Sequence, residues 1–422
     1  MHRRRQPLLR RRLLSGAAPL TAASVSRRAF LYSLGAGSLV GALASCSDRP
    51  AGTGGAGDAA ELITRPEQAL DTFELEEVAR ARLPAAHFGY LASGSDGDRT
   101  VQANRDAFDE WYLRPRRLVD VTSVDTSVTL LGEKWPTPIV MAPVGSQKAF
   151  HPDGELASAR AARAANHLQI LSSVTSTPIE EVGEARGSPL WYQLYPTSRW
   201  EIGAPIVRRA TAAGAAAIVL TVDYPGLPNR ETQHKAARLD TRNCKQCHTD
   251  PTGDMRRKPM YAGTDITYEE FFATNMTWDL IGRLREVTPR PVLIKGILTA
   301  EDAETCVRLG VDGIIVSNHG GRSLETARGT LRCLPEIASA VGGRIPVLID
   351  GGFRRGTDIL KALALGADAI CVGRPYIWGL AAFGQAGVER ALAILRTELE
   401  QGMRYTGVTS LQSITPGLVG AA

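Results

Sequence analysis

Eight short apolar runs, each followed by a helix-compatible segment, constrain the fold of this chain more than any other feature. Most of the runs lack polar alternation, which is typical of parallel strands covered on both faces. The segments between them are rich in Ala, Leu, Arg and Glu and carry Gly near their ends. Eight such units predict an α/β fold, a (β/α)8 TIM barrel, rather than an open doubly wound sheet. The runs are Pro138–Gly145, Leu168–Val174, Leu190–Pro196, Ala216–Pro225, Pro291–Ile297, Gly313–Gly320, Ile345–Gly352 and Asp368–Pro375.

Three further segments surround the predicted barrel. Residues 73–91 have a helical pattern and form an N-terminal helical extension, and residues 127–134 predict a hairpin lid at the closed end of the barrel. The gap between the fourth and fifth strands is much longer than the other gaps. We therefore expect an insertion, residues 229–278, that stands over the catalytic mouth, where the C-terminal ends of the strands meet.

Charge is distributed unevenly along the 422 residues. The net charge is +5, but residues 1–45 contain eight Arg and no Lys, Asp or Glu. The remaining chain has 41 basic and 44 acidic residues, so the folded body is not a polycation. This balance removes the main electrostatic argument for a nucleic-acid partner.

The N-terminal segment, residues 1–46, is interpreted as an export signal. Ser26-Arg27-Arg28-Ala29-Phe30-Leu31 resembles a twin-arginine signal, and an apolar stretch follows it. That stretch ends in Leu43-Ala44-Ser45-Cys46, which resembles a lipobox. We expect a periplasmic protein or one tethered to the membrane through a lipidated Cys46; a plain signal peptide and a basic tail are the alternatives. Residues 47–63 predict a flexible linker to a barrel domain at 64–410.

The loops after the seventh and eighth strands have the composition of a phosphate site. They read Asp350-Gly351-Gly352-Phe353-Arg354-Arg355-Gly356 and Gly373-Arg374-Pro375. Glycines let backbone N–H groups approach a phosphate, and these two loops are the usual phosphate site of such barrels. Arg354 and Arg374 would add fixed positive charge.

Titratable residues follow four other strands. His319 and Arg322 follow the sixth strand, where an imidazole can act as a general base and a guanidinium can bind a carboxylate. Asp223, after the fourth strand, could stabilise the protonated His319. Lys295 ends the fifth strand and could stabilise an anion, and Tyr195 follows the third. A structural histidine, a simple salt bridge and a core tyrosine are the alternative interpretations.

The motifs together resemble the FMN-dependent α-hydroxy acid oxidase/dehydrogenase family, which includes glycolate oxidase, lactate oxidase and mandelate dehydrogenase. The resemblance covers roughly residues 65–400, and the combination of its last two motifs with Gly373-Arg374-Pro375 is highly specific. The matching motifs are Tyr90–Gly94 (YLASG), Asn104-Arg105, Tyr192–Tyr195 (YQLY), Leu220–Asp223 (LTVD), Ile294–Gly296 (IKG), Ser317–Arg322 (SNHGGR) and Asp350–Gly356 (DGGFRRG).

The resemblance implies FMN as cofactor and a role for each matched residue. His319 would be the base and Asp223 its stabilising carboxylate, while Lys295 would lie by the flavin N1/O2 edge. Residues that would bind the substrate carboxylate or hydroxyl are Tyr90, Tyr195, Arg230 and Arg322. Residues that would line the flavin ring are Pro143, Val144, Gly145, Ser172, Gln193, Thr221 and Ser317. Residues that would hold the ribityl phosphate are Asp350, Gly351, Gly352, Phe353, Arg354, Gly373 and Arg374.

The implied reaction oxidises an (S)-2-hydroxy acid to a 2-oxo acid and passes two electrons to the flavin. Oxygen or a respiratory acceptor would take them onward, and a homo-oligomer is a further expectation. Two other interpretations stay open: an isomerase-type FMN barrel without net redox change, and an exported flavin electron-relay module. Departures from the family pattern are Val144-Gly145 in place of Thr-Ala, and Val174 in place of the tryptophan of several members.

The insertion contains Cys244-Lys245-Gln246-Cys247-His248, the attachment pattern of c-type haem. A covalent haem with Cys244, Cys247 and His248 is one prediction; a Cys244–Cys247 disulfide and a chance occurrence of the pentapeptide are the alternatives. The opposite axial ligand of a haem would be His234, Met255 or Met260. The remaining cysteines, Cys306, Cys333 and Cys371, are expected in the core.

Overall fold

Eight parallel strands form the centre of the computed structural model, which describes residues 62–240 and 255–422. Their hydrogen-bonded order is β4-β11-β10-β9-β8-β7-β6-β5. A parallel bridge between Met141 and Gln169 joins β4 to β5 and closes the barrel, as the eight apolar runs predict. The strands are β4 (Ile139–Met141), β5 (Ile170–Ser172), β6 (Trp191–Leu194), β7 (Ala217–Thr221), β8 (Val292–Ile297), β9 (Gly313–Val316), β10 (Val347–Ile349) and β11 (Ala369–Val372).

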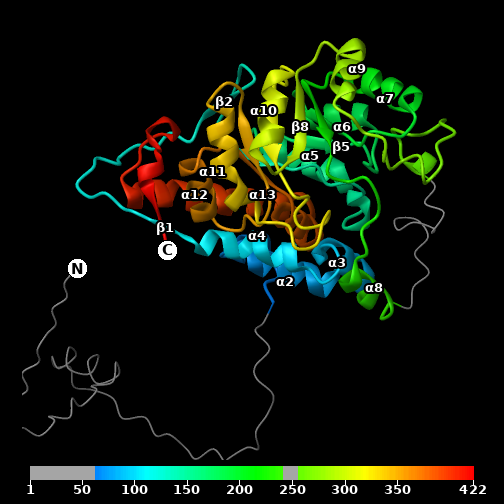
Figure 1. Cartoon of the computed structure of the whole chain (residues 1–422). Coiled ribbons are helices and arrows are strands. Elements are labelled where there is room, and N and C mark those ends of the chain that lie inside the picture. Colours follow the sequence, from blue (N-terminus) through cyan, green and yellow to red (C-terminus); the bar gives the residue numbers. More distant parts are fainter. Residues whose placement is uncertain (1–61, 241–254) are drawn as a thin grey trace, which may run out of the picture. The chain divides into compact units, whose positions relative to one another are not determined.

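A helix follows each strand and covers the outside of the barrel (Figure 1). The long connection between β7 and β8 also contains α8 (Glu231–Ala237) and the short helix Met255–Arg257. The covering helices are α5 (Gly154–Ala164), α6 (Ile179–Arg186), α7 (Trp200–Ala212), α9 (Asp279–Val287), α10 (Ala300–Arg308), α11 (Thr330–Val341), α12 (Gly356–Ala364) and α13 (Arg374–Thr406).

Alternate strand residues point into the barrel and fill it. The inward set is apolar toward the N-terminal ends of the strands and includes Val140, Leu293 and Ile315, all buried. The hairpin of β2 (Val128–Leu130) and β3 (Glu133–Trp135) closes that end, because Leu130 and Trp135 pack into the same cluster. The predicted hairpin lid is therefore confirmed. Near the C-terminal ends of the strands the inward positions become polar. The side chains that could bind a ligand or react therefore lie at one end of a packed core.

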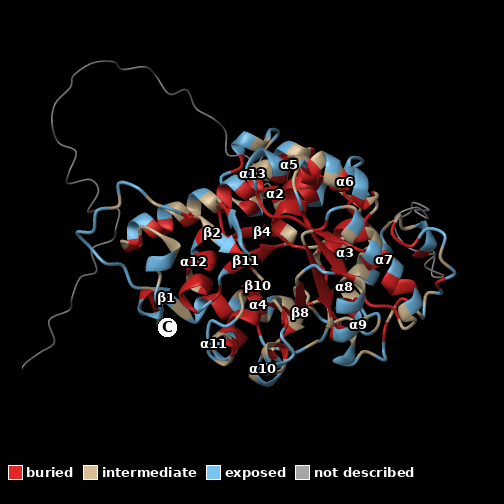
Figure 2. Ribbon diagram, turned by 90° about the horizontal axis from the view of Figure 1, so that it is seen from above, coloured by how far each residue is buried: buried red, intermediate tan, exposed pale blue. Residues whose placement is uncertain are grey.

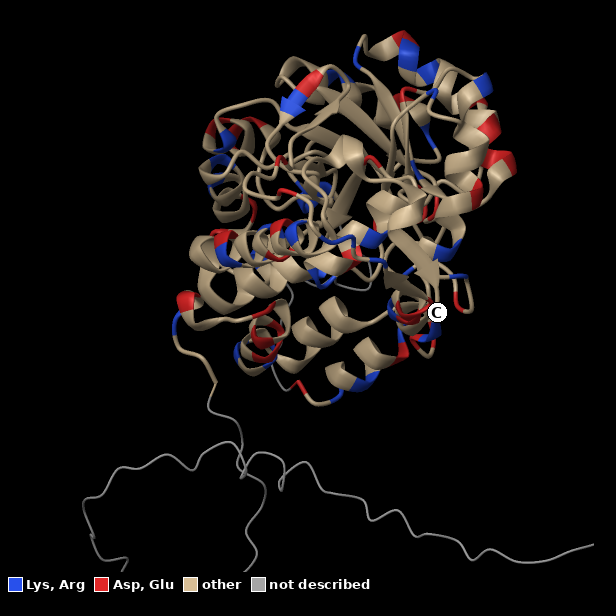
Figure 3. Cartoon of the chain, turned by 90° about the vertical axis from the view of Figure 1, so that its left-hand side faces the viewer, with Lys and Arg blue, Asp and Glu red and all other residues tan. Residues whose placement is uncertain are grey.

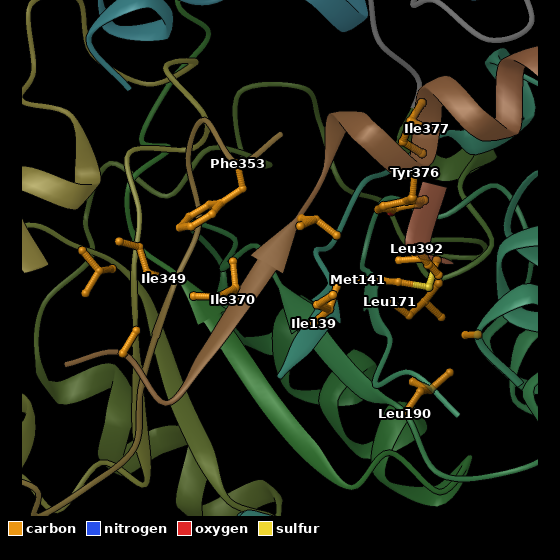
Figure 4. Close-up of a cluster of buried hydrophobic side chains, with 14 of the residues drawn as sticks. Ile139, Met141, Leu171, Leu190, Ile349, Phe353, Ile370, Tyr376, Ile377 and Leu392 are labelled. Carbon is orange, nitrogen blue, oxygen red and sulfur yellow. The ribbon is translucent and has the colours of Figure 1, made fainter. Parts of the chain in front are cut away.

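The outward strand residues pack against the helices. Figure 2 shows buried positions concentrated in the strands and on the inner faces of the helices. Figure 4 shows part of this layer, with Ile139 and Met141 of β4 beside Tyr376 and Leu392 of α13. Cys306, Cys333 and Cys371 are free and buried, as expected.

The N-terminal helices lie across the mouth of the barrel. They are α2 (Thr72–Arg82), α3 (Ala85–Ala92) and α4 (Arg99–Asp109), and they run along one side of the molecule (Figure 1). The single helical segment predicted over 73–91 is interrupted at Leu83-Pro84, since proline cannot donate the hydrogen bond that would continue α2. Thr72 donates from Oγ1 to the carbonyl of Arg354, which joins α2 to the loop after β10.

The chain continues in regular structure past residue 410. Its last strand, β12 (Val419–Ala421), pairs antiparallel with β1 (Trp111–Leu113). Basic and acidic residues are interspersed along the ribbon in the view of Figure 3. None of the helices in the described ranges has the length and apolarity needed to cross a bilayer. The predicted signal at 1–46 and most of the linker lie outside the described residues.

Candidate active site

A pocket opens at the C-terminal ends of the strands, where the sequence places the catalytic mouth. Its empty volume is about 890 Å³, part of it open to solvent. The loops after β4, β9, β10 and β11 form its walls, and α3 contributes Tyr90. The predicted residues that line it are Tyr90, Pro143, Val144, Gly145, Tyr195, Lys295, His319, Arg322, Asp350, Gly351, Gly352, Phe353, Arg354, Gly373 and Arg374.

His319 lies between Asp223 and Tyr195. Its Nδ1–H donates to Asp223 Oδ1 at 2.7 Å, which leaves Nε2 as the acceptor, 2.9 Å from the Tyr195 hydroxyl. His319 has a φ of 58°, an uncommon conformation for a residue with a side chain. The structure thus brings together three residues from the loops after β9, β7 and β6, with the basic nitrogen facing the pocket.

The electrostatics of this group suit a general base. Burial lowers the pKa of His319, and Lys295 and Arg322 lower it further against the opposing effect of Asp223. Burial raises the pKa of Asp223, but the charges of His319 and Lys295 outweigh this effect and the pKa is lowered overall. At neutral pH the imidazole is therefore neutral and the carboxylate charged, so His319 can accept a proton that Asp223 then stabilises.

Lys295 is buried at the centre of the mouth. Its Nζ donates to Ser317 Oγ at 2.7 Å and lies 3.2 Å from Asp350 Oδ2, and Ser317 in turn donates to Asp350. Burial lowers the pKa of Lys295, but the carboxylates of Asp350 and Asp223 outweigh it, so the pKa is raised. Lys295 is a permanently charged group with fixed orientation, able to stabilise negative charge at a bound ring.

Arg230 and Arg322 converge on Tyr90. Their guanidinium carbons lie 5.0 and 4.6 Å from the centroid of the Tyr90 ring. Arg322 Nη1 donates to the carbonyl groups of Tyr90 and Ser93, and within residues 62–240 and 255–422 its other nitrogens donate to no protein group. Among the described residues, the buried Nε of Arg230 has no hydrogen-bond partner. Two adjacent buried guanidinium groups with spare donors form a suitable carboxylate site.

Two more guanidinium groups, those of the buried Arg354 and the partly buried Arg374, lie by the loops after β10 and β11. Burial lowers the pKa of Arg354 to about 10, and burial together with Arg322 and Arg354 lowers that of Arg374 further below its usual range. Within the described ranges, neither side chain forms an ion pair. The hydrogen bonds of Arg374 to described residues all go to carbonyls, among them those of Leu91 at 2.9 Å and Gly320 at 2.8 Å. An anion between these groups would remove the unfavourable repulsion.

The neighbouring backbone completes this cradle. Gly351 and Gly352 have φ values of 104° and 86°, and a Cβ atom on Gly351 would lie 2.6 Å from Thr330 Oγ1. Only glycine fits here. The ring of Phe353 packs edge-on against Phe108 in the core, so Phe353 can offer only its backbone to the pocket. A dianionic phosphate such as that of FMN fits these residues in charge and in the space they leave.

Buried polar side chains stand behind the pocket wall. Ser172 donates to Gln193 Oε1 at 3.0 Å, and Gln193 Nε2 donates to Thr221 at 2.9 Å, which links the ends of β5, β6 and β7. Beside them lie Pro143, Val144 and Gly145. This wall combines fixed polar groups with small apolar residues, which suits the edge and face of a flavin ring.

The two departures from the family pattern touch each other. A Cβ atom added to Gly145 would overlap the Val174 side chain, and both residues line the pocket. The branched Val174 therefore occupies the place of the methyl group that an alanine at 145 would carry. Its small size also leaves room in this part of the pocket.

Two contributors were not predicted as site residues. Tyr224 accepts a hydrogen bond from Arg230 Nη2 at 2.7 Å, and its ring centroid lies 5.0 Å from that of His319. Asn104 exchanges hydrogen bonds with Asn318 at 2.8 and 2.9 Å and holds the loop after β9 in place. Tyr224 could have been found from the sequence, because it directly follows the predicted site residue Asp223.

Nothing in the described ranges groups three or more His, Cys, Asp or Glu side chains as a metal site would. Cys244, Cys247 and His248 lie outside these ranges. Of the proposed axial ligands, Met255 and Met260 are packed in the hydrophobic core, and His234 is exposed on α8. Neither methionine is available to a haem without unpacking the core.

Comparisons with known proteins agree with this geometry. Residues 79–421 match the family described as FMN-dependent dehydrogenase. A peroxisomal (S)-2-hydroxyacid oxidase of Arabidopsis thaliana is 41% identical over 351 residues, which cover 83% of this chain and 96% of the relative. An L-lactate oxidase of Lysinibacillus sphaericus is 42% identical, with 81% and 90% covered. The crystal structure of a mandelate oxidase with benzoyl-formic acid superposes with a TM-score of 0.75 at 37% identity, covering 84% of this chain and 99% of the other.

Tyr90 predicts a pH dependence. Burial raises its pKa, but Arg322 and Arg230 outweigh this and lower it to about 8. Above that pH the phenolate would compete with an anionic substrate for the two arginines. We expect kcat/KM for a 2-hydroxy acid to be flat near neutrality, where His319 is already neutral, and to fall through about pH 8.

In Tyr90→Phe the alkaline fall should disappear, and kcat/KM at pH 7 should drop about 2- to 10-fold through the lost hydrogen bond. The measurement is a pH profile of kcat/KM. Tyr405→Phe, which changes an exposed tyrosine, is the matched control. An unchanged alkaline limb in Tyr90→Phe would contradict the assignment.

Proposed function

The chain belongs to the FMN-dependent dehydrogenase family, and from this premise we propose that it oxidises (S)-2-hydroxy acids to 2-oxo acids. It is an FMN-dependent oxidoreductase, and the relatives compared above carry names of oxidases that act on 2-hydroxy acids. Oxygen and a respiratory acceptor both remain candidates for the final acceptor. Self-association remains a prediction of the resemblance.

One observation carries the proposal: a neutral, oriented histidine and Arg322 line the same pocket, and the buried Arg230 lies against the ring of Tyr90, which also lines it. The His319 Nε2 atom is directed by Asp223, and Arg322 lies at the same Tyr90 ring. A 2-hydroxy acid presents a carboxylate one bond from the carbon that is oxidised. The arrangement therefore binds the anionic end of the substrate and places a base by its hydroxyl-bearing carbon.

The residues divide the work as follows. Arg230 and Arg322 bind the substrate carboxylate, and Tyr90 and Tyr195 contact the carboxylate and the hydroxyl. His319 accepts the proton at Nε2, and the resulting imidazolium is stabilised by Asp223. Bound FMN would supply the acceptor for two electrons. Lys295 would hold positive charge at the edge of the ring where negative charge develops on reduction.

His319→Gln is the direct test of the base. Glutamine keeps the polar contacts but cannot accept a proton, so kcat should fall about 10²- to 10⁴-fold. The yellow FMN spectrum and the melting temperature should be retained, because the phosphate cradle is untouched. The measurement is anaerobic bleaching of the flavin by a panel of (S)-2-hydroxy acids in stopped flow.

Two outcomes would contradict the proposal. Unchanged bleaching in His319→Gln would refute the assigned base. Wild-type flavin that no 2-hydroxy acid bleaches would instead favour the isomerase or the electron-relay interpretation.

The export signal is a second part of the proposal. We propose that Arg27 and Arg28 direct the folded, FMN-loaded protein across the inner membrane and that Cys46 anchors it by lipidation. The support is the sequence pattern alone.

Replacing Arg27 and Arg28 by Lys should leave the precursor in the cytoplasm, and Cys46→Ala should release the exported protein from the membrane fraction. Cell fractionation with intact mass measurement checks both. Export of the double Lys variant at the wild-type level would contradict the twin-arginine assignment.

The Cys244-x-x-Cys247-His248 segment keeps its two interpretations, haem attachment and a disulfide. A Soret band in the absorption spectrum of protein purified from its native compartment would establish haem. With flavin bands alone, a mass increase of two hydrogen atoms per molecule on reduction is expected for the disulfide.

A further inference from the structure

Asp223 and Tyr224 are consecutive residues of the loop after β7, and they contact two different parts of the active site. Asp223 accepts the hydrogen bond from His319 Nδ1 at 2.7 Å. The Tyr224 hydroxyl accepts one from Arg230 Nη2, also at 2.7 Å. One dipeptide therefore holds both the proposed base and a guanidinium group proposed to bind the substrate carboxylate.

This dipeptide is fixed to the end of the barrel. The backbone N–H of Val222, which precedes it, donates to the carbonyl of Lys295 at 2.9 Å. The Ser323 hydroxyl, from the loop after β9, donates to the carbonyl of Asp223. The strand ends themselves therefore set the position of Tyr224.

Arg230 comes from the insertion. It directly precedes α8, and its backbone forms a parallel bridge with Asp96. Helix α8 packs on α3, which carries Tyr90, and the guanidinium carbon of Arg230 lies 5.0 Å from the centroid of the Tyr90 ring. The hydrogen bond to Tyr224 ties this guanidinium group to the barrel, where His319 lies.

Tyr224 is a neutral residue packed against the base. Burial raises the pKa of its hydroxyl and outweighs the charges of Arg230 and Arg322, so the hydroxyl keeps its proton at neutral pH. Its ring centroid lies 5.0 Å from that of His319 and 5.8 Å from that of Tyr195. The ring thus contributes to the burial that lowers the pKa of the imidazole.

We propose that Tyr224 is a positioning residue that acts through Arg230: its hydroxyl holds the guanidinium group in a fixed place relative to His319, so that one substrate molecule reaches both. This role rests on the proposed oxidation of 2-hydroxy acids. In such an acid the carboxylate is bonded directly to the carbon that is oxidised. A carboxylate site that shifts relative to the base would therefore lose the productive geometry.

Tyr224→Phe tests the hydroxyl, because it removes the acceptor and keeps the ring. The FMN-loaded full chain is assayed with (S)-lactate and (S)-mandelate, a small and a large 2-hydroxy acid. The value of kcat/KM should fall about 10-fold, and by the same factor for each acid that is turned over, because both present the same carboxylate. In calorimetric titrations the Kd of pyruvate and of benzoylformate should rise as well.

A double-mutant cycle with Arg230→Met shows whether the hydroxyl acts through Arg230. Once the guanidinium group is gone, adding Tyr224→Phe should lower kcat/KM by less than about 2-fold, so that the two changes are not additive. Tyr268→Phe is the matched control. It removes another hydroxyl from the same group of rings, which Phe272 connects to Tyr224, and it should leave kcat/KM unchanged.

Tyr224→Leu tests the ring. The imidazole should become more hydrated, and its pKa should rise toward the ordinary value of histidine. Because His319 must be neutral to act as a base, the acid limb of kcat/KM should move to higher pH in Tyr224→Leu and stay in place in Tyr224→Phe. The charged groups that act on His319, those of Asp223, Lys295 and Arg322, are the same in both variants.

The outcomes are distinguishable. The flavin spectrum and the melting temperature of each variant separate a loss of function from unfolding. Unchanged kcat/KM and Kd in Tyr224→Phe would overturn the positioning role and leave the proposed function intact. A further 10-fold loss in the double variant would do the same, because the hydroxyl would then act without Arg230. If no acid of the panel bleaches the wild-type flavin, the proposed function itself is overturned.

Discussion

Positive charge buried at one end of a closed barrel is the constraint on which the rest of this structure depends. Desolvated guanidinium and ammonium groups repel each other unless anions compensate them. Asp350 compensates part of this charge by pairing with Lys295, and the carboxylate of Asp223, which accepts a hydrogen bond from the neutral His319, also acts on Lys295. Within the described residues, Arg354 and Arg374 donate to carbonyls and form no ion pair, and Arg354 also lies over the ring of Trp378, so the folded protein gains stability when a phosphate binds.

The closely packed apolar half of the barrel stabilises the fold and offsets the cost of burying these charges. Leu130 and Trp135 close the N-terminal end, and the layers above them are filled by side chains such as Val219 and Leu348. A closely packed interior holds the strand ends in register, so that Ser172, Gln193 and Thr221 form a fixed line of hydrogen bonds. The hydrogen bonds at the mouth are therefore oriented before any ligand arrives, as electrostatic catalysis requires.

Sequence patterns predicted the barrel, the hairpin and the groups at the strand ends, because apolar runs and glycine-rich ends are local signals. The prediction of one continuous helix over residues 73–91 was wrong, since Pro84 divides this segment into the two helices α2 and α3. Tyr224 was missed for a different reason. Its relevance arises only when the long loop after β7 folds against the loop after β9, and no local pattern encodes such a contact.

The contact between Gly145 and Val174 shows why single positions mislead when a family pattern is transferred. Taken alone, each departure removes side-chain volume: Gly145 lacks the methyl group of alanine, and Val174 lacks the indole ring of tryptophan. In the structure the valine side chain occupies the volume next to the missing methyl group, so the two changes are one repacking of the same wall. Restoring alanine at 145 would require Val174 to move, and the effects of the two positions on the pocket are therefore coupled rather than additive. The shape of the substrate space follows from the pair.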